Sequence, residues 1–161
     1  MTPTDLLHTA IIPALTRLKM DSSSARRFML AIAMQESGLK HRRQVSADGS
    51  ESGPAASYWQ FEKGGGCKGV LEHRTASPFM RKVCDDFNVE PNALALWEAM
   101  RYQDIVAACA ARLLVATLPS ALPETAIDGW AQYVSAWRPG KPKPDTWANN
   151  WAIADAMVKA S

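Results

Sequence analysis

The sequence has few of the features that mark metal-binding, disulfide-rich or nucleic-acid-binding proteins. Its three cysteines, Cys67, Cys84 and Cys109, are odd in number and have no CxxC spacing, which argues against a disulfide framework or a zinc site. The three histidines are scattered, so we expect no metal and no cofactor. The 18 basic and 16 acidic residues leave a formal charge of +2, too small to predict nucleic acid as a partner. We therefore expect reduced, mostly buried thiols and no strong general electrostatic field.

Long hydrophobic runs are also missing. The most apolar stretch, AACAARLLVATL, is short and contains Arg112, which argues against membrane insertion. The first residues, MTPTDLLHTA, have neither the basic start nor the long apolar centre of a signal peptide, so we expect synthesis in the cytoplasm. The 161 residues and 47% hydrophobic content predict one domain, residues 1–161, with its own core, which we expect to be a monomer.

Helical spacing of apolar residues recurs along most of the chain and predicts a mainly α fold. The motif DSSS offers N-caps before a helix from Ala25 to Glu36, and Gly38 is a natural stop. A further helix is expected over 4–19, with Pro13 as a possible kink, and another begins at Ser77. Helical spacing then runs through PNALALWEAM into RYQDIVAACAARLLVATL. Two more helices are expected, one after Pro123 with Ile127, Trp130, Val134 and Trp137 on one face, and one over 146–159.

The stretch from Gly38 to about Arg74 is rich in Ser, Gly and charge and predicts a long irregular loop. Loops of this length in compact domains are usually functional. Within it, SYWQF predicts either a short strand or an ordered turn, and GGGCKG predicts a flexible lid or a tight turn. The run KHRR at 40–43 is either a solvated loop or a contact for carboxylates of a ligand.

Glu36 is the most informative single residue, because it places an acid where the helical pattern continues an apolar face. It follows Ile32 by four residues and Met29 by seven, so it shares their face. Partial desolvation and the negative end of the helix macrodipole both disfavour its ionisation. A carboxyl group that keeps its proton near neutral pH suits a general acid. The alternative is a solvated end of an amphipathic helix.

The island SYWQF contains the second candidate site. Tyr58 and Trp59 offer flat apolar faces, and Gln60 adds a group that both donates and accepts hydrogen bonds. Sugar rings suit such a surface, because their C–H faces stack on aromatic rings while their hydroxyls need polar partners. The alternative is a buried aromatic turn that fills the core.

Three motifs in order along residues 25–140 resemble the lytic transglycosylase and goose-type lysozyme superfamily. They are ES at 36–37, a Gly-containing stretch that ends in YWQ, and SAWRPG. In that family a helix ends in Glu-Ser, a Gly-Leu-Met-Gln-like turn follows, and an Ala-Tyr-Asn-Ala-Gly-like segment closes the cleft. The resemblance implies a lysozyme-like α fold that cleaves the β-1,4 bond between N-acetylmuramic acid and N-acetylglucosamine in peptidoglycan glycan strands. The compact chain also resembles phage-encoded lysis proteins, which act on the wall after release or as virion components.

The resemblance also implies roles for individual residues. Glu36 corresponds to the catalytic acid, Ser37 to a neighbour that orients acid or substrate, and Gln60 to a cleft residue. Trp137 and Arg138 stand where the family has Tyr and Asn, so the hydrogen bonding of that corner differs. Tyr133, one turn earlier, is a candidate to supply the missing hydroxyl.

The sequence leaves the type of reaction open. A lytic transglycosylase needs only the acid, because a hydroxyl of the substrate attacks and forms a 1,6-anhydro sugar. An inverting lysozyme needs a second carboxylate about 6.5–9.5 Å from the first to activate water. Candidates for that carboxylate are Glu62, Glu51 and Asp48, although the last two also suit loop solvation. A wall-binding or virion-structural module without turnover is the competing class.

Overall fold

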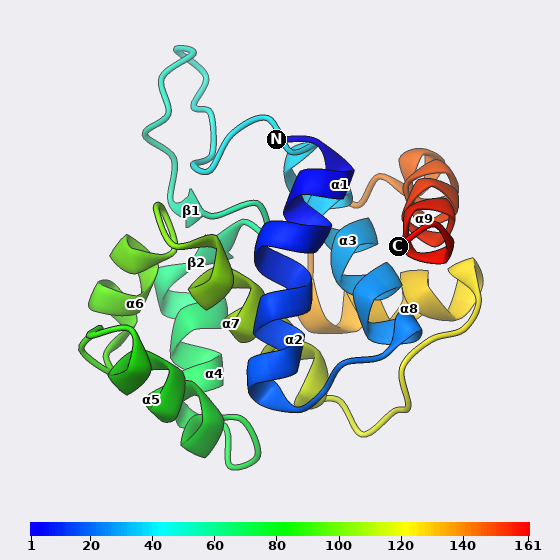
Figure 1. Ribbon diagram of the computed structural model, residues 1–161. Coiled ribbons are helices and arrows are strands. Elements are labelled where there is room, and N and C mark those ends of the chain that lie inside the picture. Colours follow the sequence, from blue (N-terminus) through cyan, green and yellow to red (C-terminus); the bar gives the residue numbers. More distant parts are fainter.

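The computed structural model describes residues 1–161 and confirms a mainly helical chain (Figure 1). A single two-stranded antiparallel sheet is the only strand pairing of regular type. The elements are α1 Pro3–Leu6, η1 Leu7–Ile11, α2 Ile12–Leu18, α3 Ser23–Ser37, β1 Ala55–Ala56, β2 Phe61–Glu62, η2 Lys63–Cys67, α4 Lys68–Glu72, α5 Ser77–Asp86, α6 Ala93–Ala99, α7 Asp104–Ala116, α8 Ala126–Trp137 and α9 Pro144–Lys159, where η marks a π-helical turn.

Helix α3 is the centre of the core. Eight of its residues between Ala25 and Met34 are buried, as expected for a helix that is covered on all sides. It packs most extensively against α9 and also contacts η1, α7 and α2. The Ser22 hydroxyl accepts from the backbone N–H of Ala25, and Gly38 ends the helix with φ +57°. The predicted start and stop of this helix are therefore confirmed.

The N-terminal helix runs almost continuously over the predicted range but contains a π-helical turn before Pro13. Proline has no N–H to donate, and its ring collides with the carbonyl four residues earlier in a regular helix. Here the backbone N–H of Ile12 donates to the Leu7 carbonyl, which widens the helix by one residue just before the proline. The π-helical turn thus accommodates Pro13, and the helix continues without a break.

The predicted irregular stretch is shorter than expected. Residues 40–54 form an arm that projects from the body (Figure 1), and SYWQF forms the turn and second strand of a hairpin, with Ala55 opposite Glu62 and Ala56 opposite Phe61. The prediction of a lid or tight turn for GGGCKG was wrong, because this segment begins a helical run of η2 and α4. Gly66 allows this packing, since a Cβ there would lie 2.6 Å from the Phe61 ring.

The C-terminal helices join the core through aromatic side chains. Tyr133 of α8 stacks on Trp147 of α9, with ring centroids 5.3 Å apart, and Trp147 meets Phe28 of α3 edge to face at 6.3 Å. The predicted apolar face of α8 was partly wrong, because Ile127 is 82% exposed and Gly129 and Tyr133 are the buried positions. The helix therefore turns the Tyr133 ring, and not Ile127, toward the core.

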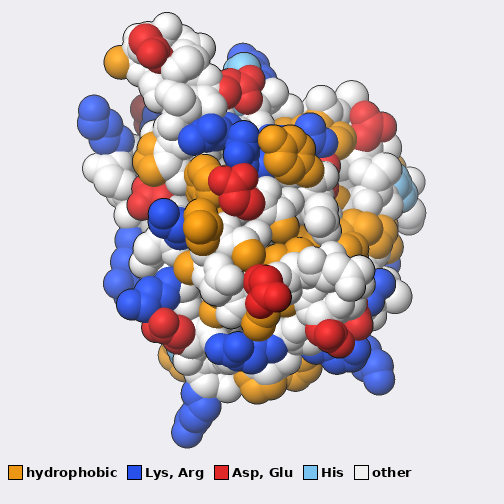
Figure 2. All heavy atoms as spheres, turned by 90° about the vertical axis from the view of Figure 1, so that its left-hand side faces the viewer, with side chains coloured by type: hydrophobic (Ala, Val, Ile, Leu, Met, Phe, Trp, Pro, Cys, Tyr) orange, Lys and Arg blue, Asp and Glu red, His pale blue; other side chains and the backbone are white.

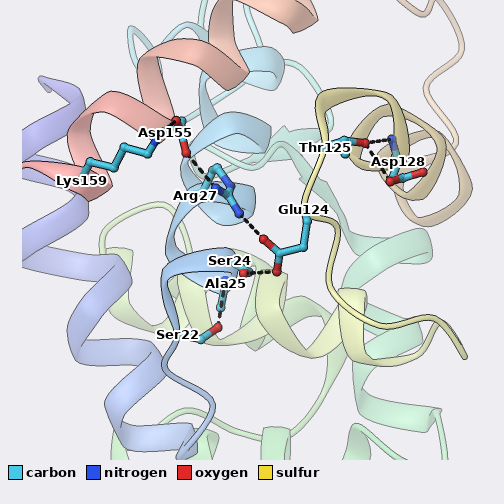
Figure 3. Close-up of polar contacts among 9 residues, drawn as sticks. All are labelled: Ser22, Ser24, Ala25, Arg27, Glu124, Thr125, Asp128, Asp155 and Lys159. Atoms are coloured by element: carbon cyan, nitrogen blue, oxygen red, sulfur yellow. Dashed lines mark hydrogen bonds and ion pairs between the residues drawn. The ribbon is translucent and has the colours of Figure 1, made fainter.

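Arg27 of α3 adds a polar connection between the same three regions (Figure 3). Its guanidinium pairs with Glu124, one residue before the Thr125 cap of α8, and with Asp155 of α9, each at 2.7 Å. Ser24 also donates to Glu124. A charge that is largely covered needs such partners, and here they tie the start of α8 to α3 and α9.

The three cysteines are free and buried, as the sequence predicts. Burial raises the pKa of the Cys67 and Cys109 thiols to about 12, so neither is a reactive thiolate at neutral pH. No helix in the structure combines the length and the hydrophobicity that crossing a membrane would require.

Gly129 offers a test of the α8–α9 contact. A Cβ at this position would overlap the Trp151 ring and lie 3.1 Å from the Trp147 ring. We expect Gly129→Ala to lower the free energy of unfolding by about 1–3 kcal/mol, because a tightly packed interface cannot absorb a methyl group. Urea denaturation measures this change. Gly69→Ala is the control, since that helical glycine has open space around its Cβ; equal stability of both variants would contradict the packing argument.

Candidate active site

Glu36 lies in the last turn of α3, where the buried helix reaches a cleft. The side chain is partly buried, and this burial raises its pKa from 4.5 to about 7. Two weaker effects oppose the rise, namely a hydrogen bond from Tyr133 and the positive charge of Lys143. Desolvation, one of the two effects that the sequence predicts, is therefore the dominant one, and it favours the protonated form of Glu36.

Tyr133 is the direct partner of Glu36. Its hydroxyl donates to Glu36 Oε1 over 2.6 Å, a short bond of the kind formed to a carboxylate. The Tyr133 ring is 3% exposed and stacked on Trp147, so the hydroxyl has little freedom to move away. Burial and the neighbouring carboxyl group both raise the pKa of Tyr133, which keeps it a donor. The pair unites residues from α3 and α8.

The cleft that Glu36 faces has a volume of about 500 Å³. Its walls come from the end of α3, the hairpin, η2, the end of α8 and the segment that joins α8 to α9. Polar and charged side chains dominate, with a few rings among them: Gln35, Gln44, Gln60, Glu62, Arg138, Lys141 and Lys143, together with Phe61, Tyr133 and Trp137. Amides, charges and occasional rings suit a ligand with many hydroxyl groups better than an apolar one.

Glu62 is the only carboxylate besides Glu36 among the residues that line the cleft. It is exposed and lies in β2, opposite Ala55. The other two sequence candidates lie outside the cleft. Asp48 accepts from the backbone N–H and hydroxyl of Ser50 in the arm, and Glu51 contacts His41 at 2.9 Å. Their role is the loop-stabilising one that the sequence left open.

The two aromatic residues predicted to face a sugar are core residues instead. Trp59 is 0% exposed, and its Nε1–H donates to the Met29 carbonyl over 3.0 Å. Tyr58 is 3% exposed and covered by the Arg42 guanidinium, 4.8 Å from the ring centroid. The prediction of stacking faces here is corrected in favour of the buried turn, because Trp59 anchors the hairpin to α3, Arg42 covers Tyr58, and neither ring leaves a face for a ligand.

The remaining predicted site residues divide into two groups. Gln60, Trp137 and Arg138 line the cleft. Trp137 is held by a bond from its Nε1–H to the Trp59 carbonyl at 2.8 Å, which links α8 to the hairpin. Ser37 does not line the cleft, because its hydroxyl donates to the Ala33 carbonyl and accepts from the Leu39 N–H, which closes the end of α3.

The basic run at 40–43 does not reach the cleft either. Arg42 forms a two-bond fork with Asp104, and Arg43 donates to the backbone carbonyls of Gly53 and Ser52. Figure 2 views the molecule from the side of the arm, where basic, acidic and apolar side chains are mixed below it. Arg43 and Arg101 both lie over the Trp97 ring. The bonds of Arg43 to the Gly53 and Ser52 carbonyls link the two sides of the arm.

Four polar or charged residues of the cleft were not predicted: Gln35, Gln44, Lys141 and Lys143. Gln35 precedes the acid directly in the sequence, and its amide bridges to the Lys143 carbonyl, Thr146 and Asn150. The two lysines lie in GKPKP, where prolines indicate a stiff connector but do not indicate which surface it follows. Only the packing of α9 against α3 brings this connector beside Glu36.

Comparisons with protein-family models, with curated proteins and with solved structures found no match to this chain. The structure also brings together no group of three or more His, Cys, Asp or Glu side chains that could hold a metal ion.

The raised pKa of Glu36 predicts how stability depends on pH. The folded protein binds this proton more tightly than the unfolded chain does, so the contribution is complete below about pH 4.5 and is lost as the pH rises through about 7. Relative to wild type, Glu36→Gln should gain up to about 3 kcal/mol of unfolding free energy between pH 4 and pH 8.

Chemical denaturation at both pH values measures this difference. Glu62→Gln is the matched control, because it removes an exposed carboxylate from the same cleft and should show no such gain. A pH-independent difference between wild type and Glu36→Gln would contradict the assignment of a raised pKa to Glu36.

Proposed function

We propose that the protein is a peptidoglycan-cleaving glycosidase of the lytic transglycosylase or goose-type lysozyme kind, with Glu36 as its general acid. One observation carries the proposal: a carboxyl group with a pKa near 7 faces a polar cleft and bonds to a fixed tyrosine hydroxyl. A purely structural or binding role would not need a desolvated acid at this place. The substrate of such an enzyme lies outside the cytoplasmic membrane, and the proposal places the action of the protein at the cell wall, after release or as part of a particle.

The first step assigned to Glu36 is proton donation. The protonated carboxyl gives its proton to the glycosidic oxygen as the bond to the anomeric carbon breaks, and the leaving sugar departs as a neutral alcohol. Glu36 is then a carboxylate, which the Tyr133 hydroxyl stabilises by its hydrogen bond. In the transglycosylase form this carboxylate then accepts the proton of the hydroxyl that attacks the anomeric carbon, whereas in the hydrolase form the second carboxylate accepts the proton of the attacking water.

The attacking group distinguishes the two forms of the proposal. In the transglycosylase form it is a hydroxyl of the muramic acid residue itself, and the product is a 1,6-anhydro sugar. In the hydrolase form it is water, activated by a second carboxylate. Glu62 is the candidate for this second carboxylate, because it lines the cleft, whereas Glu51 and Asp48 lie outside it and have other partners.

Digestion of purified peptidoglycan tests the proposal. We expect wild type to release soluble muropeptides and Glu36→Gln to lose about 10²–10⁴-fold in rate, because the amide has no proton to give. Mass analysis of the products then separates the two forms. Anhydro-muropeptides with an active Glu62→Gln variant indicate a transglycosylase, and reducing ends with an inactive Glu62→Gln variant indicate a hydrolase.

Asp48→Asn is the control for this digestion, since Asp48 is an exposed carboxylate outside the cleft, and it should keep the wild-type rate. If wild type and Glu36→Gln both bind the wall and neither releases product, the glycosidase proposal fails and a wall-binding module replaces it.

The pH profile gives an independent test. Because Glu36 must be protonated, kcat/KM should fall as the pH rises through about 7. Tyr133→Phe removes a donor that favours the carboxylate, so it should move this alkaline limb upward by about one pH unit while lowering the maximal rate. Val134→Ala, a change to the neighbouring residue of α8, is the control. A limb that stays in place in Tyr133→Phe would show that another group controls the profile.

A further inference from the structure

The segment that joins α8 to α9, residues 138–143, carries three cations that have no acidic partner. Arg138, Lys141 and Lys143 are all exposed and all line the cleft. None of the ion pairs in the structure includes any of them. This contrasts with the arginines at 42 and 43, whose guanidinium groups are already occupied by Asp104 and by backbone carbonyls.

The backbone of this segment is held at both ends. Arg138 ends α8 in the left-handed conformation, with φ +48°, and its N–H donates to the Val134 carbonyl over 3.0 Å. At the other end, the Lys143 carbonyl accepts from Gln35 Nε2 at 2.9 Å and from the Thr146 hydroxyl at 3.1 Å. Pro139 and Pro142 restrict the residues between. The cations therefore lie on a wall of defined shape.

The charge of the cleft is unbalanced while Glu36 holds its proton. Three cations then share the cleft with one carboxylate, Glu62. A hollow lined by one sign of charge concentrates the field and favours ligands of opposite sign. The occupant should therefore carry an anionic group close to the glycosidic oxygen that Glu36 protonates, and guanidinium and ammonium groups are good donors to a carboxylate.

We propose that residues 138–143 form a carboxylate-binding wall, by which the cleft selects peptidoglycan that carries free carboxylates on the muramic acid beside the cleaved bond. This inference rests on the proposed function. Two groups of the substrate can supply such a carboxylate. One is the peptide stem, and the other is the lactyl group, whose carboxylate is free when the stem has been removed. The wall binds the carboxylate of the substrate and so determines specificity, whereas Glu36 carries out the proton transfer.

The test compares three soluble glycan fragments of equal length. One carries peptide stems with free carboxylates, one carries the same stems after amidation, and one lacks stems and exposes the lactyl carboxylate. We expect wild type to show kcat/KM about three- to tenfold higher on the carboxylated stems than on the amidated stems. The double variant Arg138→Gln/Lys141→Gln should lose this preference, so that the ratio of its kcat/KM values on the carboxylated and amidated fragments falls to about one. Lys143 stays unchanged, because its charge acts on Glu36.

The double variant Lys40→Gln/Lys68→Gln is the matched control, since it removes two exposed cations that do not line the cleft, and it should keep the preference. If the kcat/KM of wild type on the stemless fragment equals or exceeds its kcat/KM on the carboxylated stems, the wall binds the lactyl carboxylate. Equal rates of wild type on carboxylated and amidated fragments would overturn the inference and leave the proposed function intact.

Binding of the same fragments separates the inference from the proposed function. Calorimetry with wild type and with the double variant measures affinity whether or not turnover occurs. A carboxylate preference in binding that the double variant loses, together with no product from any fragment, would support the wall and overturn the glycosidase proposal.

Discussion

The hydrogen bond between Tyr133 and Glu36 is the contact on which the candidate site depends, and the rest of the fold serves to place its two ends. One end belongs to a helix that is buried along most of its length. The other belongs to α8, which reaches α3 through the stack of Tyr133 on Trp147 and the edge of Trp147 on Phe28. Arg27 joins the same helices by its ion pairs with Glu124 and Asp155. Aromatic packing thus sets the distance, and the charged cluster sets the start of α8.

The site works against the stability of the fold. Burial disfavours the ionised form of Glu36, and an apolar residue at the same place would extend the core without that cost. The hydrogen bond from Tyr133 and the nearby charge of Lys143 offset part of the effect, so the pKa of about 7 is lower than burial alone would make it. A much higher pKa would leave an acid too weak to release its proton. The balance between burial, which raises the pKa of Glu36, and the two effects that lower it therefore decides whether Glu36 can act as a general acid.

Local patterns predicted the elements of the fold well, and contacts distant in sequence were predicted poorly. Ser22, Gly38 and the apolar spacing of α3 act within a few residues, so that helix was predicted with its caps, and Glu36 was found from its face. Trp59 could not be assigned, because a ring beside Gln60 looks the same whether it faces a ligand or the Met29 carbonyl. Lys141 and Lys143 were missed for a related reason: a proline-rich connector has no periodicity, and its position is set by α9.

The pairing of α3 with α9 has a consequence for the order in which the protein folds. The bond from Asn150 to Gln35 spans 115 residues, and Tyr133 meets Glu36 across 97. During synthesis the apolar surface of α3 leaves the ribosome long before the helix that covers it. The nascent chain must therefore keep this surface from aggregating until almost all of the sequence is available. In the unfolded chain Glu36 is solvated and has the ordinary pKa of a glutamate, so its raised pKa appears only once folding has buried it.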